Sequence, residues 1–219
     1  PRLVDMGHTA SFLFNAEDRA RIERLTLEVN GLSSARPEAT AKLAAGDSLS
    51  SIVPAGLASV HASEDFLSLV DRLGIITYAS MDEVAPLRHS YPVNRPLESM
   101  ARGLVVSYLY VDAPETDDPS IVKFIASCSP FPTADGWAGN PAGNLYRVVE
   151  PFYHEALAGS IGRSSDYTRD SFYTGLTAVV PLLAKDGSTL AVLGLDYFAG
   201  NEHDELQSLR VTEIGRAHV

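Results

Sequence analysis

Two long apolar runs near the end of the chain, joined by a tight turn, constrain the fold more than any other feature. Residues Thr174–Ala184 read TGLTAVVPLLA, and residues Ser188–Phe198 read STLAVLGLDYF. Both runs are rich in residues that favour strands, and Lys185-Asp186-Gly187 between them is a typical turn sequence. The pair therefore predicts an antiparallel β-hairpin.

A second pair of strands precedes this hairpin. Residues Gly103–Ala113 (GLVVSYLYVDA) and Ile121–Cys128 (IVKFIASC) flank a turn-rich segment that includes Pro119. Strands joined by hairpins form antiparallel sheets. The apolar runs are longer than strict alternation requires, so we expect helices or loops to cover both faces of the sheet.

Helical patterns dominate the first half of the chain. Asn15 is a suitable N-cap for a helix with apolar residues at helical spacing, which Gly31 is expected to end. A second helix is expected from Ser63 to Gly74. Less regular patterns predict a short strand over Ile75–Tyr78, an amphipathic helix over Tyr146–Leu157 and a last helix after Asn201.

These elements predict an α+β fold with four parts. Residues 1–14 are expected to be a linker or foreign to the natural domain, and residues 15–102 a helical region that packs on the sheet. Residues 103–200 would form the sheet core. Residues 201–219 would form a helix that leads to a membrane span or output domain outside this sequence.

Charge and composition narrow the classes of partner. The 219 residues carry a formal charge of −11, which argues against binding to nucleic acid or to anionic lipid. The single cysteine, Cys128, excludes an intrachain disulfide. No apolar run approaches the roughly 18 residues that a membrane span needs, so any membrane anchors would lie outside this sequence.

The sequence shows no recognisable catalytic constellation. The six histidines lack metal-ligand spacing, and neither a nucleophile elbow nor a phosphate-binding loop occurs. Cys128 is more simply explained as a buried structural thiol. We therefore expect no catalytic residue, no metal and no cofactor in this domain.

The run Tyr167–Tyr197 resembles the C-terminal part of bacterial Cache sensor domains, which are PAS-like. The matching elements include Thr177-Ala178, Pro181-Leu182, the turn at Asp186-Gly187 and the segment Leu193-Gly194-Leu195-Asp196. The helix from Ser63, the YLYVDA strand and the DGWAGNPAGNLY loop are also similar to these sensors.

The resemblance implies a five-stranded antiparallel PAS-like sheet, a long N-terminal helix and a ligand pocket under a helical and loop lid. It also implies a position outside the cytoplasmic membrane, in the periplasm or extracellular space. The amino-acid-binding members of the family carry Arg-x-Trp, whereas Asp135 stands two residues before Trp137. The resemblance therefore does not extend to free amino acids as ligands.

Asp196 is the most informative candidate for a ligand site. Strand alternation places it on one face with Leu190, Val192 and Gly194, where a carboxylate needs a partner. A ligand amine or an arginine could be that partner, or Asp196 could cap a turn at the end of the strand. Aromatic residues on neighbouring segments, and residues where the family has ligand-facing groups, complete the predicted ligand-binding set: Tyr110, Tyr146, Tyr167, Asp170, Tyr173 and Asp196.

The leading interpretation is a sensor domain of a membrane-bound cyclase, histidine kinase, phosphatase or chemoreceptor that binds a small molecule. A homodimer through the terminal helices is compatible with this interpretation. The alternatives are a cytosolic PAS- or GAF-like regulatory domain and, with less support, a small hydrolase.

Overall fold

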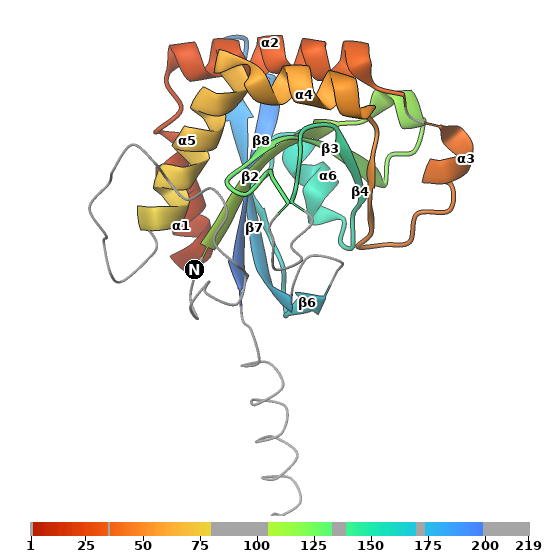
Figure 1. The fold of residues 1–219 in the computed structure, drawn as a ribbon. Helices are drawn as coiled ribbons and strands as arrows, with labels where there is room; N and C mark the ends of the chain where they lie inside the picture. The colour runs from red at the N-terminus through yellow and green to blue at the C-terminus, as the bar shows by residue number, and fades with distance from the viewer. Residues whose placement is uncertain (1, 35, 80–104, 133–138, 170–173, 199–219) are drawn as a thin grey trace, which may run out of the picture.

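One antiparallel sheet with helices on both faces forms the centre of the computed structural model (Figure 1). The structure describes residues 2–34, 36–79, 105–132, 139–169 and 174–198. The strands follow the spatial order β1-β4-β3-β2-β8-β7-β5, and β6 also pairs with β7. They are β1 (Ser48–Ser50), β2 (Val105–Asp112), β3 (Ile121–Ser127), β4 (Asn144–Arg147), β5 (Gly162–Arg163), β6 (Thr168–Arg169), β7 (Thr174–Leu183) and β8 (Thr189–Phe198).

The two faces of the sheet are covered differently. Helices on one face enclose an aliphatic core, whereas the other face carries a cluster rich in tyrosine and phenylalanine under the short helix α6. The helices are α1 (Arg2–Ser11), α2 (Ala16–Leu32), α3 (Pro37–Thr40), α4 (Pro54–Ala62), α5 (Glu64–Ala79) and α6 (Phe152–Leu157), with a 3₁₀ turn η2 (Pro114–Thr116).

The four long strands agree with the sequence prediction, and so does the α+β class. β2 pairs with β3 and β7 pairs with β8, both antiparallel. Gly187 in the β7–β8 turn has a φ of 87°, a conformation that glycine adopts without strain. The sheet is wider than the expected five strands because the short segments β1, β5 and β6 also pair with it.

The long N-terminal helix is α2, and its start is fixed by a capping box. The Asn15 side chain accepts from the Asp18 backbone N–H at 2.9 Å, and the Asp18 carboxylate accepts from the Asn15 backbone N–H at 3.2 Å. Three residues of α2 are fully buried in the aliphatic core, as their helical spacing predicts: Ile22, Leu25 and Val29. The helix ends at Leu32, one residue beyond Gly31.

Two local predictions are wrong. The predicted strand over Ile75–Tyr78 is helical, because α5 continues through Gly74 and adds the buried Ile76 to the same apolar stripe. The predicted helix over Tyr146–Leu157 is divided: its first part is strand β4, and only Phe152–Leu157 is helical, after Pro151. Proline at that position has no backbone N–H and favours a helix start over a helix interior.

The structure adds detail to the predicted division of the chain on its N-terminal side, whereas the predicted C-terminal helix is not described. The segment expected to be a linker over residues 1–14 contains α1, which packs on β7 and β8. Ala10 of α1 and Phe14, three residues after its end, are both buried. The short strand β1, within residues 15–102, joins the sheet through β4. The helix expected after Asn201 lies outside the described residues.

A buried lysine joins α2 to the sheet. Lys123 on β3 has no exposed surface; its ammonium donates to Asn30 Oδ1 at 2.6 Å and pairs with the Glu115 carboxylate. Glu115 also accepts from Ser33 Oγ at 2.8 Å, directly after α2. Burial alone would raise the pKa of Glu115, but hydrogen bonds from Lys123 and its other partners lower it overall. Hydrogen bonds to these two charged groups thereby connect the end of α2 to β3 and η2.

Candidate functional site

A buried carboxylate lies at the centre of the sheet, on the face that α6 covers. Asp196 on β8 is 7% exposed. Its Oδ1 accepts hydrogen bonds from Tyr108 Oη on β2 at 3.0 Å and from Thr177 Oγ1 on β7 at 2.8 Å. Since β8 lies between β2 and β7, three adjacent strands hold one carboxylate oxygen in place. A buried acceptor with oriented hydroxyl donors is a preorganised polar site.

The register of the strands explains why Tyr108 reaches Asp196. Tyr108 pairs across the strands with Gly194, and Thr177 pairs with Asp196 itself. A Cβ atom at Gly194 would lie 2.1 Å from the Tyr108 ring. Glycine at this position therefore allows the ring to lie over β8, so that its hydroxyl meets the carboxylate two residues further on.

Aromatic side chains surround this polar centre and form what we call the aromatic face. The Tyr108 ring packs edge-on against Phe124 at a centroid distance of 5.2 Å, and Tyr146 lies 5.7 Å from Phe124. Tyr110 Oη donates to the Tyr153 carbonyl of α6 at 3.0 Å. The members of the cluster are Tyr108, Tyr110, Val122, Phe124, Tyr146, Val148, Phe152, Tyr153, Ala156, Val179 and Val192.

The phenol of Tyr110 illustrates the electrostatics of the aromatic face. Burial raises its pKa well above the ordinary value, and the nearby Tyr153 and Asp196 raise it further. Tyr110 is therefore a neutral hydrogen-bond donor at physiological pH. A neutral phenol contributes apolar bulk and one oriented hydroxyl to the wall of a site.

The structure brings together three of the six predicted ligand residues. Tyr110, Tyr146 and Asp196 lie on the same face of the sheet, and the two tyrosines are almost fully buried. Tyr167 directly precedes β6, which pairs with β7 at Gly175, so it lies near the same end of the sheet as Asp196. Asp170 and Tyr173 lie outside the described residues.

Two residues that contact Asp196 are absent from the predicted set. Tyr108 has the same strand alternation as Tyr110, which was the available signal for it. Thr177 could be found only from the register of the hairpin, in which it lies opposite Asp196. The expected apolar neighbour Leu190 instead packs with the aliphatic core on the other face.

Other candidate chemistry has simpler explanations in the described part of the chain. Burial raises the pKa of the Cys128 thiol, although hydrogen bonds from Thr77 and Ser107 oppose this shift, so the reactive thiolate is disfavoured. Among the described residues, no group of three or more His, Cys, Asp or Glu side chains could bind a metal ion. None of the helices described is both long and apolar enough for a membrane crossing.

No family model and no curated protein sequence matches the chain. Two solved structures of the ligand-binding domain of the chemoreceptor Tlp3 from Campylobacter jejuni are similar to it. The complex with L-valine aligns with a TM-score of 0.31 and 14% identity, covering 89% of this chain and 58% of that chain. The complex with 4-methylisoleucine aligns with a TM-score of 0.30 and 14% identity, covering 90% and 60% respectively. The chain thus spans less than two thirds of the length of that chemoreceptor domain.

Proposed function

We propose that the chain is a non-catalytic, ligand-sensing domain of a membrane-bound signalling protein, positioned outside the cytoplasmic membrane. The ligand would be a small molecule bound over the aromatic face, with Asp196 as its polar anchor. Tyr110, Tyr146, Tyr167, Asp170 and Tyr173 belong to the same proposed site. The output domain would be of the cyclase, histidine kinase, phosphatase or chemoreceptor type.

The observation that carries this proposal is the buried Asp196 carboxylate with its two hydroxyl donors. Removing a carboxylate from water is costly, and apolar residues at the same three positions would pack without that cost. A fixed carboxylate among aromatic rings is well suited to a ligand with an ammonium or hydroxyl group. We assign this buried charge to ligand recognition.

The arrangement also supports a route for the signal. Asp196 lies near the end of β8, the central strand of the sheet, and β8 contacts both α1 and α2. A ligand that binds one arrangement of these elements better shifts the equilibrium by no more than its differential affinity. A coupling of about 1–3 kcal/mol is sufficient for signalling.

Two variants with the same loss of charge test the role of Asp196. We would screen small metabolites by thermal shift and measure the affinity of each positive compound by calorimetry. Asp196→Asn removes the charge and keeps an oxygen acceptor, so it should weaken binding by about tenfold or more, as expected for a hydrogen bond to a charged group. Asp186→Asn removes an exposed charge from the β7–β8 turn and serves as the control.

Equal affinity of the wild type and Asp196→Asn for every ligand found would assign Asp196 a structural role. The alternative of a hydrolase is tested with the same protein. Turnover of an ester, phosphate or peptide substrate that a point substitution abolishes would replace the sensor proposal with an enzymatic one.

A further inference from the structure

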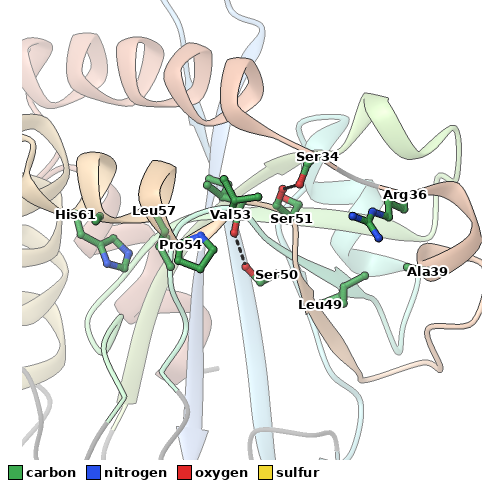
Figure 2. Close-up of a pocket in the computed structure, with 12 residues that line it drawn as sticks. Ser34, Arg36, Ala39, Leu49, Ser50, Ser51, Val53, Pro54, Leu57 and His61 are labelled. Atoms are coloured by element: carbon green, nitrogen blue, oxygen red, sulfur yellow. Dashed lines mark hydrogen bonds between the residues drawn. The ribbon is translucent and has the colours of Figure 1, made fainter.

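A concave region lies beside β1 at the edge of the sheet. This pocket has a volume of about 640 Å³ and is bounded by the segment after α2, by β1 and by one side of α4 (Figure 2). None of its lining residues belongs to the aromatic face. Its size is typical of small-molecule sites, which range over roughly 300–1,000 Å³.

Arg36 gives the pocket its charge. It is the one arginine or lysine among the described lining residues, which include no aspartate or glutamate. The Arg36 side chain has no hydrogen bond or ion pair with any residue in the described part of the chain, whereas Arg24 and Arg147 are paired with carboxylates. In a protein of net charge −11, an arginine without a carboxylate partner at a pocket wall favours an anionic ligand.

The start of α4 adds to this preference. Val53 and Pro54 line the pocket, and Val53 is the N-cap of α4 without a side-chain hydrogen bond to the helix. The first backbone N–H groups of a helix lack intrahelical acceptors, and the helix dipole places partial positive charge at this end. Both effects stabilise a negative group near Pro54.

His61 provides a polar atom at the other end of the pocket. In Figure 2, His61 and Arg36 lie at opposite ends, with Val53 and Pro54 between them. The His61 ring stacks on Phe66 at 4.6 Å, and its buried Nε2 has no hydrogen-bond partner among the described residues. Burial lowers the pKa of His61, so the ring is neutral and offers one donor and one acceptor.

Apolar side chains line the space between these two ends. Leu49 of β1 and Leu57 of α4 are partly buried at the wall. We propose that this pocket binds a small, elongated carboxylic acid, with its carboxylate at Arg36 and the start of α4 and its apolar chain along Leu57. This site is separate from Asp196 and goes beyond the sensing role proposed for the aromatic face.

The pocket is connected to two other parts of the molecule. Ser34, two residues after the end of α2, donates its backbone N–H to the Ser51 carbonyl at 2.6 Å. Ser51, which is buried at the pocket wall, donates its hydroxyl to the Gly143 carbonyl at the end of the Gly/Pro-rich loop before β4. A bound carboxylic acid would therefore stabilise the contacts among α2, α4 and this loop.

Ligand-observed NMR with butanoate, hexanoate and octanoate tests the proposal, with hexanol as the uncharged comparison. At least one of the carboxylates should bind the wild type, and hexanol should bind more weakly. Arg36→Gln should weaken carboxylate binding by about tenfold or more, the usual value of a charge-assisted hydrogen bond. Lys42→Gln removes an exposed cation six positions further along the chain that does not line the pocket, and should change the affinity by less than about twofold.

A second matched pair tests the location on α4. Ala58→Glu places a negative charge on the pocket wall and should abolish binding, whereas Ser59→Glu places the same charge on the same helix outside the lining. Asp196→Asn should leave carboxylate binding unchanged, so the two proposed sites can fail independently. The proposal is overturned if no carboxylate binds, if hexanol binds as tightly, or if Arg36→Gln and Lys42→Gln behave alike.

Discussion

Gly194 shows how one missing side chain organises the centre of the sheet. The Tyr108 ring occupies the space that a side chain at position 194 would take, and this places the Tyr108 hydroxyl at Asp196. The requirement is steric, since Gly194 is not among the residues with a positive φ. The hydrogen bond from Tyr108 to Asp196 therefore depends on glycine at position 194.

The first prediction compares two glycine substitutions. Gly194→Ala should destabilise the protein by about 1–3 kcal/mol or more, because the new methyl group and the Tyr108 ring cannot both be accommodated. Gly31→Ala, in α2 with no atom within 4 Å of the added carbon, should be neutral or stabilise by up to about 1 kcal/mol. Urea denaturation followed by circular dichroism measures both changes. Equal stability of the two variants would show that the Tyr108 ring does not need the space.

At the scale of elements, polar contacts in the first turn of α2 stabilise the helix alongside its buried apolar face. The capping box at Asn15 and Asp18 satisfies backbone groups at the start of the helix, and Asp18 also pairs with Arg72 of α5 at 3.0 Å. Arg24 of α2 and Asp65 of α5 form a further ion pair at 2.7 Å. The start of α2 is thus attached to α5 by charges, in addition to the buried residues behind it.

The second prediction concerns this cap. Asn15→Ala should reduce the free energy of unfolding by about 1 kcal/mol, since the backbone N–H of Asp18 loses its acceptor. Glu23→Ala, at an exposed position inside α2, is the control and should change stability by less than about 0.5 kcal/mol. Chemical denaturation measures the free energy of unfolding of both variants. An equal loss in the two variants would mean that the Asn15 cap makes no specific contribution to stability.

Prediction from the sequence succeeded where one element contained its own signal. The β7–β8 hairpin combines strand formers with a turn that needs glycine, and α2 combines an N-cap with apolar residues at helical spacing. It failed where the deciding partner is distant. Tyr146 is in a strand because Ser48 and Val122 pair with it, and nothing near Tyr146 in the sequence reveals those partners.

The candidate site follows the same division. Alternation along β8 identified Asp196, and alternation along β2 identified Tyr110. The hydroxyl donors Tyr108 and Thr177 depend on the register between strands, which the individual strands do not specify. The pocket at Arg36 was not predicted at all, because it is formed by three segments with no shared sequence pattern.

At the scale of the whole molecule, the end of α2 is joined to the sheet through the ion pair of the buried Lys123 and the partly exposed Glu115. Its partners Asn30 and Ser33 belong to the end of α2 and the residue after it. Ile22, Leu25 and Val29 of the same helix are fully buried. Lys123 is therefore the main polar contact between β3 and α2 among the residues described.

The third prediction is the pH dependence of this connection. Because the pKa of Glu115 is lowered in the folded protein, its contribution to stability is present at neutral pH and is lost as the pH falls through the folded pKa. Stability should therefore decline from about pH 5 towards pH 3, and Glu115→Gln should show a smaller decline. Thermal unfolding across this range measures the difference. Parallel curves for the wild type and Glu115→Gln would contradict the assigned role.

The position of β8 has a consequence for the order in which the molecule can assemble. β8 is the last strand of the described sheet to be synthesised, yet it lies between β2 and β7. Until it leaves the ribosome, the strands β1-β4-β3-β2 and the group around β7 share no edge. The nascent chain must keep two half-sheets apart and exposed, and it then joins them by inserting a single strand. The domain is therefore expected to reach its native state in one late step, in which β8 pairs with β2 and β7 together.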